Sequence, residues 1–122
     1  MTTQTVAPAV QPSTLLTERI LWLVAVERQA QDAKWGEQNH PLGTGAAPFK
    51  ALADTYRDAC DAAAERGEVT WAHIALEEVF EALAETDPNA FVTEALQAAA
   101  VLVAAIESEV RNNPALILPP PF

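Results

Sequence analysis

The chain has 122 residues, half of them hydrophobic, which is enough for one domain with a compact core. Its 7 basic and 17 acidic residues give a net charge of −10, and this charge repels double-stranded nucleic acid and anionic membrane surfaces. The single cysteine, Cys60, excludes an intramolecular disulfide and is typical of a reducing compartment.

The N-terminal part of the chain predicts an arm, a long helix and a loop. Residues 1–13 are a polar, proline-containing arm without the basic and apolar regions of a signal peptide. Ser13 or Thr14 can cap a first helix over 15–35. Within it, residues 20–26 are apolar on nearly every face, so they need cover on two sides, which a second subunit would supply. Residues 36–48 then form a long loop containing glycine and proline.

Three further helices are expected in the rest of the chain. The second covers 48–66 and ends at Gly67, a good C-terminal cap residue. Thr70 caps the third, over 71–86. Asp87 then provides the N-cap of the fourth helix, which opens on a proline and ends near residue 112. The sequence contains no strand pattern, so the predicted fold class is all-α.

The fourth helix and the tail are the most apolar segments. The run from Ala95 to Ile106 is interrupted by Gln97 and is too short and too rich in alanine to span a bilayer. Residues 114–122 form a proline-rich tail with large apolar side chains that can pack on a neighbour. We therefore expect a soluble, cytoplasmic protein with one helical domain over 14–113, assembled as a homodimer or homotetramer and with no membrane or double-stranded nucleic-acid partner.

Three glutamates stand where two paired helices would direct them to one point. Glu78 and Glu81 are three residues apart on the third helix and therefore share a face. Glu94 and Gln97 repeat this spacing on the fourth helix. Glu94 precedes a nearly uninterrupted apolar segment, where an unpaired charge would be costly. Converging carboxylates are typical ligands of hard cations, so the pattern predicts a magnesium site. A solvated acidic helix face is the alternative interpretation.

The spacing ExxE, twelve residues, ExxQ resembles the ExxE…ExxD signature of the MazG-like, all-α nucleoside triphosphate pyrophosphohydrolases, which include dCTP pyrophosphatases and dimeric dUTPases. The doublet Glu77-Glu78, the following Val79 and the apolar run after Gln97 extend the likeness, which covers residues 15–110. The segment ERQAQDAKWGEQNHPLGTG is also similar to MazG-like proteins of bacteria and their phages. One position departs from the signature, because Gln97 replaces an aspartate and offers an oxygen ligand without a charge.

The resemblance implies a helical bundle of four main helices that hydrolyses an NTP or dNTP to the monophosphate and pyrophosphate. Glu78, Glu81 and Glu94 would ligate Mg²⁺, or Mn²⁺ in its place, with Gln97 as a weaker fourth ligand. Glu77 would orient or deprotonate the attacking water. The candidates for substrate binding are basic or aromatic residues: Lys34, Trp35, His40, Lys50 and Arg57. A salt bridge is the alternative role for each of the lysines and the arginine.

Two other functions fit the same sequence. A non-catalytic nucleotide-binding protein would use the same pocket, with Gln97 marking a weakened metal site. A purely structural helical oligomer would present the acidic pairs as solvated faces. His73 is expected to be a surface or core residue rather than a ligand, and the tryptophans Trp22, Trp35 and Trp71 to be core or interface residues.

Overall fold

The computed structural model describes residues 12–116 and residue 118. Within this part of the chain all regular secondary structure is helical, in four helices: α1 (Pro12–Trp35), α2 (Ala47–Glu65), α3 (Trp71–Ala84) and α4 (Pro88–Asn112). The prediction of an all-α fold with four helices is therefore confirmed.

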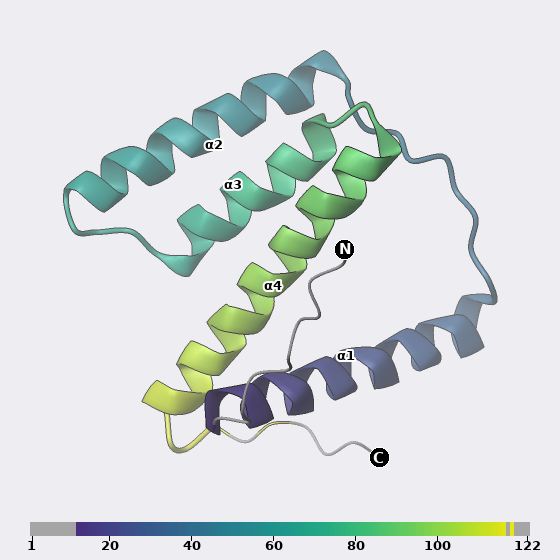
Figure 1. Ribbon diagram of the computed structural model, residues 1–122, viewed down its shortest axis with the longest axis vertical. Coiled ribbons are helices and arrows are strands. Elements are labelled where there is room, and N and C mark those ends of the chain that lie inside the picture. The colour runs from purple at the N-terminus through teal and green to yellow at the C-terminus, as the bar shows by residue number, and fades with distance from the viewer. Residues whose placement is uncertain (1–11, 117, 119–122) are drawn as a thin grey trace, which may run out of the picture.

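The helices are arranged as a three-helix layer with α1 attached at one end (Figure 1). Helix α3 packs between α2 and α4, and it forms a hairpin with α4. The N-terminal half of α1 crosses the C-terminal half of α4, and among the described residues α1 packs on no other helix. Residues 36–46 lead from the far end of α1 back to the start of α2. A single chain therefore does not close these helices into a compact four-helix bundle.

Predicted caps define the ends of three helices. The Thr70 hydroxyl accepts the His73 backbone N–H, and the Thr70 backbone N–H donates to His73 Nδ1 at 3.1 Å, which forms a capping box at the start of α3. Asp87 accepts the Ala90 backbone N–H at 2.9 Å at the start of α4. Gly67 follows α2 with a φ of +69°. These cap predictions are confirmed, and His73 has a structural role at the helix start.

Helix α1 begins earlier than predicted. It includes Pro12, Ser13 and Thr14, so the prediction that Ser13 or Thr14 is its N-cap is wrong. Proline is favourable at a first helical position, because its φ is fixed near the helical value and it has no N–H to leave unpaired. Of the predicted arm, residues 1–11 lie outside the described residues.

The connection between α1 and α2 is hydrogen-bonded to the end of α3 and to the turn that follows it. Gly45 donates its backbone N–H to the Leu83 carbonyl at 2.9 Å, and the Thr44 hydroxyl donates to the Glu85 carbonyl. Gly45 has a φ of +88°, and a Cβ atom there would lie 2.6 Å from Thr86 Cγ2. We call this contact the Gly45 latch. The Leu83 carbonyl thus bonds outside its own helix, and α3 ends at Ala84, two residues before Thr86, the predicted boundary.

The core of the described chain is small and consists mainly of alanine. Its buried hydrophobic residues are Ile20, Ala53, Cys60, Ala63, Ala82, Ala98 and Val103. Ile20 is the one large side chain that is fully buried among the described residues. The rings of Tyr56 and Phe80 stack between α2 and α3 with centroids 5.1 Å apart. Small side chains therefore let the three layered helices approach closely, but they bury little apolar area.

The three tryptophans lie outside this core. Trp22, Trp35 and Trp71 are 45, 59 and 38% exposed. The expectation that they are core residues is therefore wrong for the single chain, since only alanines and a few larger residues fill its interior. A role at an interface stays a prediction.

Helix α4 is long and apolar enough to cross a membrane by length and composition. It contains an 18-residue window with a mean hydropathy of 1.6, of which 11% is buried inside the chain. The argument that its apolar run is too short to span a bilayer therefore does not hold for the whole helix. A mostly buried core helix of a soluble protein can have the same length and composition, but α4 is little buried in the single chain; it carries one acidic residue, Glu94, within the apolar region. The structure is thus compatible with a soluble protein.

Candidate metal centre

Three carboxylates from two helices meet near the turn between α3 and α4. Glu78 and Glu81 come from α3 and Glu94 from α4, and one oxygen of each lies within 4.8 Å of the other two. All three residues are half-buried. Within the described residues this is the one group of His, Cys, Asp or Glu side chains close enough to share a metal ion. The helical spacing and the hairpin bring the glutamates together as the sequence predicts.

Two oxygens of this cluster are buried without a hydrogen-bond partner. They are Oε2 of Glu78 and Oε2 of Glu94. A buried carboxylate oxygen that loses water and gains no partner destabilises the folded state. A hard divalent cation such as Mg²⁺ or Mn²⁺ would satisfy such oxygens, because these ions prefer oxygen ligands. The burial also argues against a solvated acidic face, whose oxygens would be open to water.

Burial and mutual repulsion raise the pKa values of the cluster. Burial is the main cause for Glu81, whose pKa rises to about 7, followed by the charges of Glu78, Glu77 and Glu94, while Arg57 opposes the rise. The pKa of Glu78 is also raised, by burial first and then by Glu77 and Glu94. Like charges held together in this way favour protonation or the binding of a cation.

We expect the stability of the metal-free protein to depend on the ionisation of Glu81. Its pKa is about 7 in the folded state against the usual 4.5, so the folded state binds this proton more tightly than the unfolded state. The resulting stabilisation is complete below pH 4.5 and is lost as the pH rises to about 7. Glu81→Gln, which resembles the protonated side chain, should match the wild-type thermal midpoint near about pH 4 and exceed it near about pH 8 in EDTA.

Thermal unfolding of both proteins across this pH range measures the difference directly. Subtracting the two midpoints removes the contribution of the acidic residues that do not interact with Glu81. A difference that does not grow with pH would contradict the raised pKa of Glu81.

A cavity of about 610 Å³ opens beside the carboxylates, within the size range of small-molecule sites. Glu81 and Glu94 form part of its wall. Its other polar lining residues come from α2 and from the turn after α3: Lys50, Asp54, Arg57, Glu85 and Thr86. The cavity therefore combines the acidic cluster with positive charge from α2.

The two basic residues of the cavity differ in their partners. Arg57 forms an ion pair with Asp54, which is the main cause of the raised pKa of Arg57. Glu81 contributes to that rise more weakly. Lys50, at the start of α2, has no ion-pair partner among the described residues. The Arg57 guanidinium is thus held by Asp54, and the Lys50 ammonium is available to an anionic ligand.

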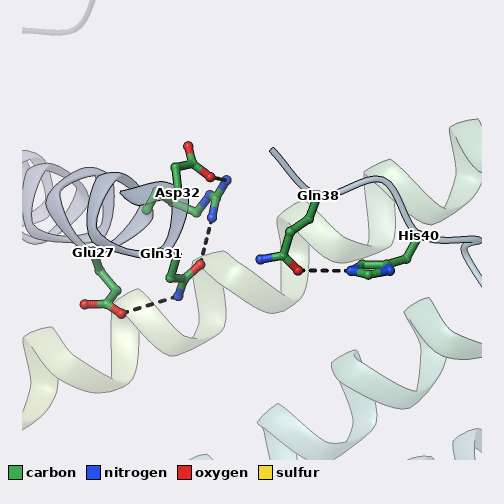
Figure 2. A network of polar contacts seen from close by, with 6 residues as sticks. Glu27, Gln31, Asp32, Gln38 and His40 are labelled. Carbon is green, nitrogen blue, oxygen red and sulfur yellow. Dashed lines mark hydrogen bonds and ion pairs between the residues drawn. The ribbon is translucent and has the colours of Figure 1, made fainter. Parts of the chain in front are cut away.

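The remaining substrate-binding candidates lie elsewhere. Trp35 and His40 line a separate hollow with Gln38, and this hollow shares no lining residue with the acidic cavity. His40 Nε2 lies 3.0 Å from Gln38 Oε1 (Figure 2). The Lys34 ammonium lies 4.7 Å from the Trp35 ring centroid, in a cation–π contact. The structure therefore divides the five predicted substrate residues: the two on α2 line the cavity, and the other three do not.

Neither Glu77 nor Gln97 lines the cavity. Glu77 is half-buried, and its charge acts on Glu78 and Glu81. Burial, with a hydrogen bond to Glu77, raises the pKa of the Cys60 thiol to about 11, so this cysteine stays protonated. Gln97 is exposed on α4. The roles of Glu77 as general base and of Gln97 as fourth ligand stay predictions.

Three polar residues of the cavity are not predicted from the sequence. Asp54 precedes Arg57 by three residues on α2, so helical spacing could have identified this pair. Glu85 and Thr86 follow the end of α3 and carry no periodic pattern. Their position follows from the Gly45 latch, which joins segments far apart in the sequence.

Comparison with known proteins identifies no relative. No protein-family model matches the chain, and no curated protein or solved structure shows a significant match to it. Together, the fold and the site define an all-α chain with a candidate centre for a hard cation, beside a cavity lined by both acidic and basic residues. The functional argument therefore depends on this geometry and on the short acidic signature.

Proposed function

We propose that this protein is a Mg²⁺-dependent nucleoside triphosphate pyrophosphohydrolase that converts an NTP or dNTP to the monophosphate and pyrophosphate. One observation carries the proposal. The acidic cluster of Glu78, Glu81 and Glu94 has two unpaired buried oxygens and borders a cavity that also contains two basic residues. A site for a triphosphate–metal complex needs both elements, since carboxylates hold the ion and cations bind phosphate. The resemblance to the MazG-like enzymes supplies the type of reaction.

The three clustered glutamates would hold the ion, with Gln97 as the predicted fourth ligand. When bound, a divalent cation offsets the negative charge of the phosphate oxygens. Arg57 can donate two parallel hydrogen bonds to a phosphate once it exchanges its Asp54 partner, and Lys50 acts as a point charge. Glu77 would accept a proton from water as the water oxygen attacks the α-phosphorus. The bond from that phosphorus to the α,β-bridging oxygen breaks, and pyrophosphate leaves.

A second candidate function is non-catalytic nucleotide binding in the same cavity. It is favoured by the exposed, uncharged Gln97 at the position where the enzyme family has an aspartate. Such a protein would sequester a nucleotide without turning it over. A structural helical oligomer is the third candidate, and it predicts neither binding nor turnover. We propose a cytoplasmic setting for the first two, in keeping with the single reduced thiol.

The direct experiment incubates the purified protein with Mg²⁺ and a panel of canonical and modified NTPs and dNTPs and measures pyrophosphate release. We expect release from at least one nucleotide and a loss of roughly 100-fold or more in Glu81→Gln, because charge stabilisation at the phosphates is lost. Glu109→Gln, at an exposed position of α4, is the matched control and should retain wild-type activity. Nucleotide binding by calorimetry without release would favour sequestration, and the absence of both would favour a structural oligomer.

Replacing Gln97 tests the departure from the family signature. Gln97→Asp restores a charged oxygen ligand, so it should tighten Mn²⁺ and Mg²⁺ binding and keep or raise turnover. If the wild-type protein only sequesters nucleotide, the same variant should gain activity. Calorimetric titration with metal and the pyrophosphate assay measure the two effects. A variant that changes neither would show that Gln97 lies outside the site.

A further inference from the structure

Helix α4 carries an apolar seam that the single chain covers only in part. Val92, Leu96, Ala99, Val103 and Ile106 follow alternating steps of four and three residues, the spacing of a helix–helix contact. Val103, which is 8% exposed, lines a groove together with Thr17 and Leu21 of α1. At the other end of the seam, Val92 and Leu96 are 53 and 66% exposed. The uncovered part therefore continues an existing helix–helix interface.

An apolar groove of about 240 Å³ lies along this seam, between α4 and α1. Ala99, Ala100 and Ala104 leave it open, and the half-exposed Leu21 and the more exposed Leu96 flank it. The two polar residues of its lining, Thr17 and Glu107, hydrogen-bond to each other. A groove of alanines with satisfied polar groups fits an apolar helix surface better than a polar ligand.

One row of side chains on α4 is complementary to itself when reversed. Val92, Leu96, Ala100 and Ala104 are four residues apart, with large side chains at the first two positions and small ones at the last two. Two copies of α4 packed antiparallel would set Leu96 over Ala100 and Val92 over Ala104 of the other copy. A two-fold axis repeats both contacts, which is how isologous dimers pack.

The distribution of charged residues also favours this face of α4 as the contact with a second copy of the chain. A chain with a net charge of −10 repels a copy of itself over most of its surface. From Phe91 to Ile106 the only charged residue of α4 is Glu94, which belongs to the acidic cluster with α3. The face of α4 that carries Leu96 and the alanines therefore has no charged residue between Val92 and Ala104, and Glu107, at the end of the groove, accepts a hydrogen bond from Thr17.

We propose that a second copy of this chain covers this face of α4, with the two α4 helices antiparallel and Leu96 of each copy over Ala100 of the other. A standard interface buries about 800 Å² per partner around an apolar centre. Val92, Leu96 and Leu21, with the three alanines between them, supply that centre. A lipid bilayer would cover the same face but would place Glu94 at membrane depth, where a carboxylate is expensive. This proposal does not depend on the proposed catalytic activity.

Light scattering at micromolar concentration tests the assembly. The wild-type protein should have the mass of a dimer, and Leu96→Glu and Ala100→Glu should each halve it. Leu42→Glu is the matched control, because Leu42 is 45% exposed in the loop after α1 and should leave the dimer intact. A wild-type monomer would overturn the proposal, and so would a dimer that both α4 variants leave unchanged. Flotation of the wild-type protein with phosphatidylcholine vesicles would also overturn it, in favour of a membrane.

A cross-linking experiment tests the packing without burying a charge. In a Cys60→Ala background, an equimolar mixture of the single variants Leu96→Cys and Ala100→Cys should form a covalent dimer with a short bismaleimide, because neither chain alone carries two cysteines that could link within one helix. The control Cys60→Ala/Leu42→Cys should stay monomeric on a denaturing gel. Absence of the cross-link between the α4 variants would contradict the antiparallel arrangement, even if the protein is dimeric.

Discussion

Millimolar Mg²⁺ or Mn²⁺ should raise the thermal midpoint of the wild-type protein, and Glu78→Gln/Glu81→Gln should abolish that rise. A ligand that binds only the folded state at 100 times its dissociation constant adds about 2.7 kcal/mol of stability, or roughly 10 °C for a small domain. The double variant loses two of the three clustered carboxylates and one of the two unpaired buried oxygens. It therefore loses both the charge and part of the geometry that a hard cation needs.

The same variant should have the opposite effect in EDTA. Without an ion, the clustered carboxylates repel one another, and burial disfavours their charge. Two neutral amides remove this repulsion, so the metal-free double variant should unfold at a higher temperature than the wild type near neutral pH. Differential scanning fluorimetry with metal and with EDTA measures both effects in one series.

A matched control separates the cluster from the general acidity of the chain. Glu37→Gln/Glu109→Gln removes the same number of charges at exposed positions. It should keep the metal response and shift the metal-free midpoint little. An unchanged wild-type midpoint at millimolar metal would rule out the metal site, whatever the variants do.

The sequence predicts local structure well because local interactions define it. The fourth helix begins where Asp87 caps it, and the third begins where Thr70 does. The convergence of Glu78 and Glu81 with Glu94 needs only helical spacing and a tight turn between two helices. Each of these features depends on residues fewer than about twenty positions apart, for which the backbone leaves few alternatives.

Long-range arrangement is where the prediction was incomplete. Lys34, Trp35 and His40 are near Lys50 in the sequence, but residues 36–46 carry the chain from the end of α1 to the start of α2, so the first three line no part of the acidic cavity. A segment without helix or strand has no periodic sequence pattern from which its path could be predicted. Its end is determined by the Gly45 latch, a contact between residues about forty positions apart, which appears only once the helices are placed.

The exposure of large apolar side chains on α1 also depends on long-range arrangement. The sequence shows that residues 20–26 of α1 need cover on two sides, and the structure shows one side covered by α4. Leu21 and Val24 remain 51 and 46% exposed, while Ile20 is fully buried. A hydrophobic pattern predicts that a residue will be covered, but it does not identify the covering surface, which can belong to another chain.

Gly45→Ala should destabilise the protein more than alanine at other glycines with positive φ. A methyl group at this position would lie 2.6 Å from Thr86 Cγ2, in a backbone with a φ of +88°. Left-handed backbone costs a non-glycine residue roughly 1–2 kcal/mol, and a forced displacement of a packed segment roughly 1–3 kcal/mol more. Gly36 and Gly67 have φ values of +72° and +69° and open space around the added atom, so Gly36→Ala and Gly67→Ala should show the backbone cost alone.

A second substitution separates the clash from the backbone strain. Thr86→Ser removes Cγ2, the atom nearest to the added methyl group, and keeps the hydroxyl. In the Gly45→Ala background it should recover the steric part of the loss, about 1–3 kcal/mol, whereas in the Gly36→Ala background it should recover nothing. Urea unfolding of the single and double variants gives the coupling energy. Equal losses for Gly45→Ala and Gly36→Ala, with no coupling to Thr86, would contradict the latch. A positive coupling would show that the segment after α1 packs against the turn that forms the rim of the acidic cavity.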